Sequence, residues 1–94
     1  MISGPTCCSG GITGYGSTSS GICFIGIAPG RTEVATGRPF TGVSGRLLDA
    51  VLKTAGIVRD DVYCTNLICW YKDHPRTEEI NVCHPRLLRE LAEL

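Results

Sequence analysis

Apolar residues along this chain form two kinds of run, one typical of buried strands and one typical of helices. Residues 22–27 and residues 62–68 are short, nearly continuous apolar runs that predict two buried strands. Between them, four apolar residues recur at helical spacing before Gly56. This pattern predicts an amphipathic helix over about residues 45–55, with Ser44 as its N-cap and Gly56 as its stop signal.

The C-terminal third has a second helical pattern that contains a proline. Thr77 is suited to cap a helix whose apolar side would carry Ile80, Leu87, Leu88, Leu91 and Leu94. Because Pro85 lies within this pattern, the helix is expected to be interrupted there or to begin near it. Residues 1–21 and residues 28–43 have no apolar period and are predicted to be loops, the second of them a long functional loop.

The order strand–helix–strand–helix predicts an α/β fold with a parallel sheet on which the helices pack. Two strands are too few for a stable sheet of this kind. The apolar pattern of the last helix also continues up to Leu94. We therefore expect residues 1–94 to form the N-terminal portion of a single larger domain.

Composition limits the classes of function. The chain has 94 residues, 43% of them hydrophobic, and a formal net charge of zero, so no overall field attracts nucleic acid or a membrane. No stretch is long and apolar enough to span a bilayer, and the N-terminus lacks the pattern of a signal peptide. We expect a cytoplasmic monomer without a membrane partner.

Six cysteines are many for a cytoplasmic chain of this length. Cys23 and Cys64 fall inside the two strand-like runs, which favours their burial as small apolar residues. The other four lie in loops or at the ends of elements, where they are better placed to bind a metal or a cluster: Cys7, Cys8, Cys69 and Cys83.

Two loops after the first strand are candidates for ligand binding. The first is Gly26-Ile27-Ala28-Pro29-Gly30, at the carboxyl end of a strand, where ligands bind in open α/β folds. The second presents Phe40 between Pro39 and a Thr-Gly turn. Such loops suit the capture of a flat, polar ring. On the residues alone, Phe40 could equally be a core aromatic, and Asn66 could be a turn residue.

An ordered set of short motifs runs through most of the chain: Phe24-Ile25-Gly26-Ile27-Ala28-Pro29-Gly30, Glu33, Gly37-Arg38-Pro39-Phe40-Thr41-Gly42, Gly45-Arg46-Leu47-Leu48-Asp49, Ala55-Gly56-Ile57, Arg59, Asp61-Val62-Tyr63, Thr65-Asn66, Glu79-Ile80, Cys83-His84-Pro85 and Leu87. This set resembles the uracil-DNA glycosylase superfamily, and most closely its iron–sulfur family 4 with the DNA-polymerase-related phage branch. The resemblance implies a three-layer α/β/α domain with a parallel central sheet, of which this chain would be an incomplete part.

The implied reaction is hydrolysis of the N-glycosidic bond of deoxyuridine in DNA, after the base has been flipped out of the stack. The resemblance assigns stacking on uracil to Phe40 and hydrogen bonds with the polar edge of the base to Asn66. It assigns the rest of the uracil pocket to Gly26, Ile27, Ala28, Pro29 and Gly30. The implied partner is DNA that contains uracil.

The chain departs from the family pattern at its catalytic positions. Ile27 stands where the family-4 loop carries a glutamate that helps to activate water, which is similar to the apolar family-5 loop. Glu33 matches a second acidic position and is the remaining candidate for a catalytic carboxylate. The family's His-Pro-Ser loop is absent from these 94 residues.

The family also implies a [4Fe–4S] cluster held by four cysteines, here Cys7, Cys8, Cys69 and Cys83. The family's first pair is Cys-x-x-Cys, whereas Cys7 and Cys8 are adjacent, with Pro5 in the place of the first ligand. A zinc site and unligated thiols are the alternatives. Two alternatives to the enzyme follow: a catalytically inactive nucleic-acid-binding relative that carries the cluster, and a small cysteine-rich metal or redox protein.

Overall fold

The computed structural model describes residues 11–71 and 75–94. Its centre is a sheet of three strands in the order β1-β3-β2. The middle strand β3 (Tyr63–Asn66) runs parallel to β2 (Cys23–Gly26) and antiparallel to β1 (Tyr15–Gly16). All four residues of β3 are buried, as expected for a strand with a partner on each side.

Both predicted strands are confirmed, and their parallel pairing is confirmed with them. Two expectations are wrong at β1. Residues 1–21 were predicted to be a loop, and the sheet was predicted to be wholly parallel, whereas β1 is a strand that pairs with β3 in the antiparallel direction. A strand of two residues is too short to show a period, so the Gly/Ser/Thr-rich sequence around Tyr15 contained no signal for it. Its hydrogen bonds with β3 depend on a distant part of the chain.

Helix α2 (Val43–Thr54) confirms the predicted amphipathic helix, but it begins earlier than expected. Its N-cap is Gly42 rather than Ser44. Only half of the predicted apolar positions face the core: Leu48 and Leu52 are buried, whereas Leu47 is 68% exposed. Helical spacing alone does not say how wide the buried face is.

Helix α1 (Arg31–Thr36) corrects the prediction of an unbroken loop over residues 28–43. Six residues span fewer than two turns, and none of them is buried, so no apolar period could reveal the helix. Gly30 is its N-cap and Gly37 its C-cap, and the φ of 76° at Gly37 is the left-handed conformation common after helices. A short 3-10 helix, η1 (Arg59–Asp61), precedes β3.

Helix α3 (Thr77–Ala92) continues through Pro85, so the expected interruption is wrong. The N-cap is Arg76 rather than Thr77, and the backbone N–H of Arg76 donates to Glu79 Oε1 at 2.9 Å. Pro85 removes one backbone donor, but Cys83, Arg86 and Leu87 on either side of it are buried. Tertiary packing therefore holds the helix together across the proline.

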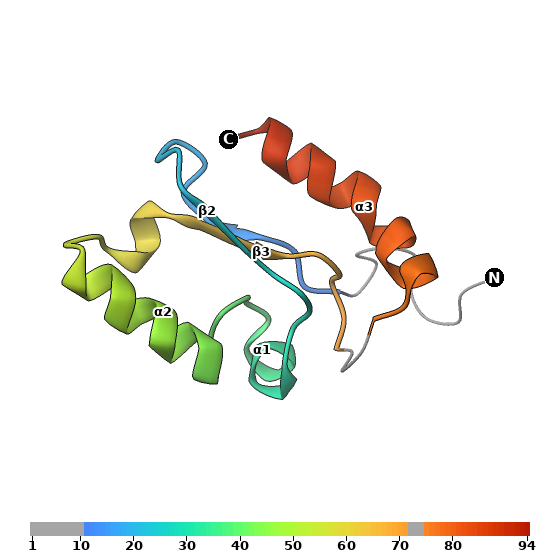
Figure 1. Ribbon diagram of the computed structural model, residues 1–94, viewed down its shortest axis with the longest axis horizontal. Coiled ribbons are helices and arrows are strands. Elements are labelled where there is room, and N and C mark those ends of the chain that lie inside the picture. The colour runs from blue at the N-terminus through green and yellow to red at the C-terminus, as the bar shows by residue number, and fades with distance from the viewer. Residues whose placement is uncertain (1–10, 72–74) are drawn as a thin grey trace.

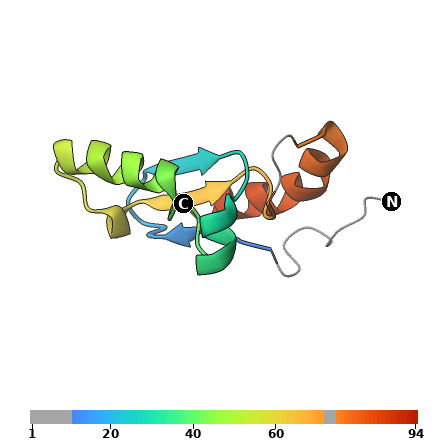
Figure 2. The same ribbon diagram turned by 90° about the horizontal axis from the view of Figure 1, so that it is seen from below.

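The helices lie on both sides of the sheet. Figure 1 shows α1 and α2 on one side and α3 on the other. Figure 2 shows the strands from the side of α1 and α2, with α3 behind them. One apolar cluster centres on Leu48, Leu52, Val62 and Cys64, and a second on Ile68, Cys69 and Cys83. Within the described residues, no helix is long and apolar enough to cross a membrane.

Candidate functional site

The carboxyl ends of the two parallel strands lie side by side. Gly26, the last residue of β2, is in register with Asn66, the last residue of β3. The pairing extends beyond both strands, because the N–H of Leu67 donates to the carbonyl of Gly26 at 2.8 Å and that of Ile68 to Ile27 at 2.9 Å. The first candidate loop therefore starts beside Asn66, at the sheet edge where ligands bind in α/β folds.

A cavity of about 250 Å³ opens at this edge, lined by Gly26, Ile27, Ala28, Glu33, Phe40, Ser44 and Asn66. Five of the seven residues predicted for a uracil pocket line it. The other two do not: Pro29 is fully buried, and Gly30 serves as the N-cap of α1. Ser44, which the sequence suggested as a helix cap, is instead part of the cavity wall.

Gly26 allows the ring of Phe40 and the side-chain amide of Asn66 to lie close together. A Cβ atom at this position would lie 3.1 Å from Phe40 Cζ and would overlap Asn66 Oδ1. Only glycine therefore leaves both side chains where they are. Asn66 itself is 5% exposed, and its backbone carbonyl accepts a hydrogen bond from Arg86 Nη2 at 2.8 Å. The backbone from which its side-chain amide reaches the wall is thus held in place.

Glu33 lies on the wall of the cavity, but both of its carboxylate oxygens are engaged by backbone. Oε1 accepts from the N–H of Gly30 at 2.7 Å, and Oε2 accepts from the N–H of Thr41 at 3.2 Å. The side chain therefore joins the loop after β2 to the loop that carries Phe40. This is the geometry of a residue that holds two loops together, and each oxygen of the predicted catalytic carboxylate already accepts one hydrogen bond.

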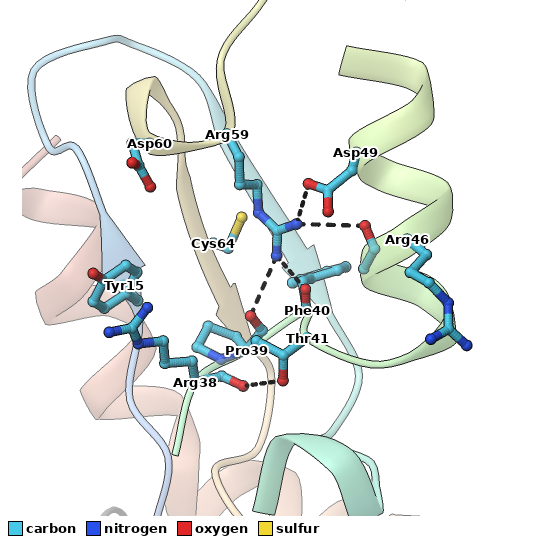
Figure 3. Close-up of a pocket in the computed structure, with 11 residues that line it drawn as sticks. Tyr15, Arg38, Pro39, Phe40, Thr41, Arg46, Asp49, Arg59, Asp60 and Cys64 are labelled. Atoms are coloured by element: carbon cyan, nitrogen blue, oxygen red, sulfur yellow. Dashed lines mark hydrogen bonds and ion pairs between the residues drawn. The ribbon is translucent and has the colours of Figure 1, made fainter. Parts of the chain in front are cut away.

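Phe40 separates the first cavity from a second one of about 270 Å³, which is shown in Figure 3. Arg59 crosses this second cavity and forms an ion pair with Asp49 at 2.6 Å. Burial opposes the charge of Arg59, but the hydrogen bond and negative charge of Asp49, together with the neighbouring Cys64, outweigh it and raise the pKa of Arg59. On the other wall, the guanidinium of Arg38 lies 4.4 Å from the centroid of the Tyr15 ring.

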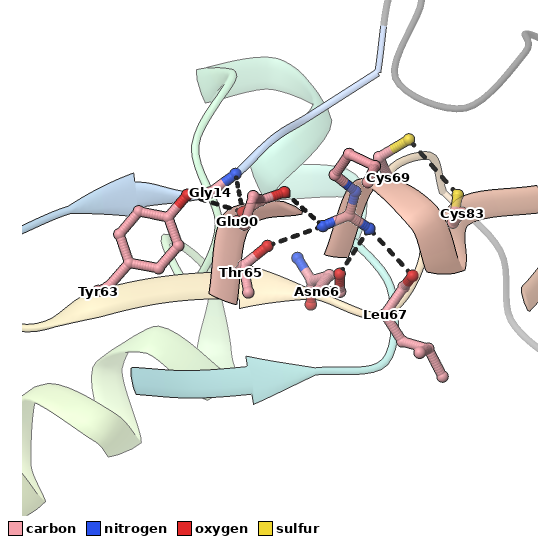
Figure 4. A network of polar contacts seen from close by, with 9 residues as sticks. Gly14, Tyr63, Thr65, Asn66, Leu67, Cys69, Cys83 and Glu90 are labelled. Atoms are coloured by element: carbon pink, nitrogen blue, oxygen red, sulfur yellow. Dashed lines mark hydrogen bonds and ion pairs between the residues drawn. The ribbon is translucent and has the colours of Figure 1, made fainter. Parts of the chain in front are cut away.

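A buried network behind the strands was not found by reasoning from the sequence (Figure 4). Arg86 in α3 donates to Glu90 Oε2 at 2.6 Å, to Thr65 Oγ1 at 3.0 Å and to the carbonyls of Asn66 and Leu67. The only local signal was the spacing of four residues between Arg86 and Glu90. That spacing is also common on exposed helices, so it could not indicate a buried network.

Glu90 is the second centre of this network. Its Oε1 accepts from the hydroxyl of Tyr63 at 2.7 Å and from the N–H of Gly14 at 3.1 Å. Burial tends to raise the pKa of Glu90, but the hydrogen bonds from Arg86 and Tyr63 outweigh it and lower the pKa. Burial and the same hydrogen bond raise the pKa of Tyr63. Glu90 therefore joins α3 as a carboxylate to β3 and to Gly14, the residue before β1.

Cys69 and Cys83 meet on the α3 side of the sheet. Both are fully buried, and their sulfurs are 3.6 Å apart. The segment before β1 passes against them, because the N–H of Ile12 donates to the carbonyl of Cys69 at 2.6 Å. Cys7 and Cys8 lie outside the described residues. Among residues 11–71 and 75–94, no group of three or more His, Cys, Asp or Glu side chains could hold a metal ion.

Cys23 and Cys64 belong to the strands, as predicted. Cys64 is 3% exposed and packs in the cluster under α2, whereas Cys23 is half-buried. Burial raises the pKa of both thiols, so both are neutral at neutral pH. Both serve as packing residues of the sheet, and Cys64 also lines the second cavity beside Arg59.

Residues 13–94 match the uracil DNA glycosylase superfamily, and the chain belongs to that family. Within it, the chain is similar to type-4 uracil-DNA glycosylases. It is 40% identical over 86 residues to that of Archaeoglobus fulgidus, a match that covers 88% of this chain and 43% of the relative. It is 36% identical over 86 residues to that of Pyrobaculum aerophilum, covering 88% and 44%. It is 39% identical over 83 residues to that of Thermotoga maritima, covering 85% and 43%.

The chain thus spans about two fifths of the length of these curated relatives. The resemblance read from the motifs is confirmed at the level of the family.

Proposed function

We propose that this chain forms the uracil-recognition part of a uracil-DNA glycosylase, which releases uracil from DNA in base excision repair. The observation that carries the proposal is the cavity where Phe40, Asn66 and the glycine-rich loop after β2 meet. Its volume of about 250 Å³ suits a single flipped base. The type-4 relatives support the same reaction.

Recognition of uracil would rest on one ring and one amide. The ring of Phe40 stacks on the base. The amide of Asn66 accepts from the N3–H of uracil and donates to its neighbouring carbonyl oxygen. Cytosine has an acceptor at N3 and an amino group beside it, so the same amide in the same orientation would meet like groups. Asn66 would thereby discriminate uracil from cytosine.

The reaction would break the bond between C1′ and the base nitrogen, with the electron pair leaving on uracil. A water oxygen bonds to C1′, and the proton of that water is released. Ile27 and Ala28 line the site where the water would lie, and the carboxylate of Glu33 is engaged by backbone. We infer that this part of the enzyme stabilises the uracil anion through Asn66, rather than activating water through a carboxylate.

The chain would be the N-terminal portion of a larger three-layer α/β/α domain. Two observations support this. The type-4 relatives are more than twice as long as the part that matches. Within the described residues, β2 pairs only with β3, so its other edge is open to a further strand. A cytoplasmic location and a monomeric state stay predictions of the sequence.

A [4Fe–4S] cluster is the cofactor we propose, with Cys7, Cys8, Cys69 and Cys83 as its ligands. The described part of the site supplies two fully buried thiols from different elements, whose sulfurs lie 3.6 Å apart and would separate when each bound its own iron. Ile12, four residues after Cys8 in the sequence, donates its N–H to the carbonyl of Cys69. Such a cluster would supply a covalent link between three segments of the fold.

The test is uracil release from a single-stranded oligonucleotide with one deoxyuridine, by anaerobically purified protein. The chain is assayed alone and together with the part of the Archaeoglobus fulgidus glycosylase that lies beyond the match. We expect release in at least one of these preparations. Phe40→Ala should lower it by about tenfold to a hundredfold, since stacking on a base contributes about 1–3 kcal/mol. Leu88→Ala, an exposed change on α3, is the control.

A second candidate function is favoured by Ile27, which stands 63% exposed on the cavity where the family-4 loop carries its glutamate. It is a relative that binds uracil in DNA without releasing it. The oligonucleotide would then bind to the protein, and Phe40→Ala would weaken binding, while no release occurred in either preparation. If the folded protein neither bound the oligonucleotide nor released uracil, both functions would be contradicted.

A further inference from the structure

Phe40 holds a backbone conformation that a bulky residue seldom adopts. Its φ is 57°, in the left-handed region, and within the described residues it is the only non-glycine residue with a positive φ. A side chain with a Cβ is disfavoured there, so the conformation persists only where neighbouring groups hold it. The backbone sets the direction of the Cα–Cβ bond of Phe40, so whatever holds the backbone also limits where the ring can lie.

Arg59 makes the side-chain contacts that hold it. Its Nη2 donates to the carbonyl of Phe40 and, more weakly at 3.4 Å, to the carbonyl of Pro39. Its Nη1 donates to Asp49 at 2.6 Å and to the carbonyl of Gly45 at 3.4 Å. Figure 3 shows this single guanidinium between the Phe40 loop and helix α2. One planar fork therefore connects the loop with the helix that follows it.

The backbone at Gly45 also lies close to the carbonyl of Phe40. A Cβ at position 45 would collide with the carbonyl of Phe40, and residue 45 is buried in the first turn of α2. The Phe40 carbonyl is thus enclosed between the backbone of α2 and the guanidinium of Arg59. The guanidinium carbon lies 5.9 Å from the centroid of the Phe40 ring, on the side of the second cavity. The ring also lines the first cavity.

We propose that Arg59 is the positioning residue of the uracil pocket: it fixes the left-handed backbone of Phe40 and so holds the ring in the stacking position. This inference rests on the proposed function of the pocket. Arg59 acts through Phe40 and does not itself touch the base. Lysine cannot replace it, because a single ammonium lacks the planar fork that donates to the carbonyl of Phe40 and to that of Gly45 together.

The test uses ¹⁹F NMR of the full chain labelled with 4-fluorophenylalanine. The chain has two phenylalanines, so Phe24 serves as an internal reference. In Arg59→Lys, the Phe40 resonance should shift and broaden while that of Phe24 stays. The matched control is Asp49→Asn, which removes the ion pair but leaves the contacts of Arg59 with the loop. We expect it to keep the Phe40 resonance.

Gly45→Ala gives a second route to the same result, should Arg59→Lys fail to fold. Its new methyl group would displace the Phe40 carbonyl and shift the same resonance. Equal spectra for Arg59→Lys and the unsubstituted chain would overturn the inference. Equal changes in Arg59→Lys and Asp49→Asn would also overturn it, since Arg59 would then act only through general stability.

The functional readout is binding of the deoxyuridine oligonucleotide to the same samples. Arg59→Lys should weaken it by about tenfold or more, because a ring displaced by about an ångström loses its stacking geometry. Asp49→Asn should leave it unchanged. If the unsubstituted chain bound no oligonucleotide, the proposed function would fail. The NMR result, which needs no ligand, would still decide whether Arg59 positions the ring.

Discussion

Arg86 shows at the scale of one residue how the cavity is supported from behind. It is 5% exposed, and its guanidinium reaches a helix carboxylate, a strand hydroxyl and two carbonyls at the end of β3. One of those carbonyls belongs to Asn66, whose amide lines the cavity. A buried charge of this kind is tolerated only with its partner present, so Glu90 is essential to it.

Glu90→Gln tests this dependence. The pKa of Glu90 is lowered in the folded chain, so its stabilisation is present above its ordinary value of 4.5 and is lost as pH falls through the folded value. The substitution should reduce the free energy of unfolding at pH 7 by about 2–3 kcal/mol, because Arg86 loses its buried counter-charge. It should also flatten the decline of stability with acid. Urea unfolding at a series of pH values measures both effects.

Glu93→Gln is the matched control, since Glu93 follows the same helix and is exposed. We expect it to leave the midpoint of unfolding and its pH dependence unchanged. An equally steep acid decline in Glu90→Gln and in the unsubstituted chain would show that Glu90 is not the titrating group.

At the scale of elements, two contacts hold segments that are distant in sequence. The carboxylate of Glu33 joins the start of α1 to the loop before α2. The thiols of Cys69 and Cys83 join the turn after β3 to α3, 14 residues further along the chain. The first contact shapes the cavity, and the second marks the place where the proposed cluster would link α3 to the N-terminal segment.

Anaerobically purified protein should contain iron and acid-labile sulfide, at about four of each per chain if the cluster is complete. Cys83→Ser should lower both contents strongly, because it removes a buried ligand. Cys64→Ser, a buried thiol of β3 away from this pair, is the control and should retain them. Elemental analysis with sulfide determination measures the contents. Zinc in place of iron would support the alternative metal site. The absence of both metals would indicate unligated thiols.

At the scale of the whole molecule, apolar side chains remain on the outer face of α2. Val43, Leu47 and Val51 recur every four residues and are 76%, 68% and 56% exposed. Ile25 on β2, at the open edge of the sheet, is 48% exposed. A contiguous apolar face of this kind usually packs against something. The proposed larger domain would cover it with its remaining strands and helices.

The exposed face of α2 should bind the dye 1-anilinonaphthalene-8-sulfonate. The double variant Leu47→Lys with Val51→Lys should lose most of the dye fluorescence while keeping the midpoint of thermal unfolding, because both side chains lie outside the core. Leu88→Lys, which changes a similarly exposed leucine on α3, is the control and should keep the fluorescence. Equal fluorescence in both variants would place the dye elsewhere and contradict an apolar face on α2.

The sequence by itself determined the elements whose signals are local. Continuous apolar runs predicted β2 and β3, helical spacing predicted α2, and the ordered motifs indicated the family. The motifs also led to Gly26, Phe40 and Asn66, because glycine-rich loops at strand ends have a characteristic composition. These features depend on residues that are neighbours in the sequence, so the sequence alone is enough to predict them.

Only the tertiary structure decided which distant groups meet. The pairing of β1, the continuity of α3 through Pro85 and the exposure of Leu47 all depend on contacts made across the molecule. The same is true of the backbone hydrogen bonds to both Glu33 oxygens and of the hydrogen bond from Arg59 to the carbonyl of Phe40. Hydrogen bonds between side chains and distant backbone leave no period in the sequence. Their partners are therefore fixed by the fold and not by spacing along the chain.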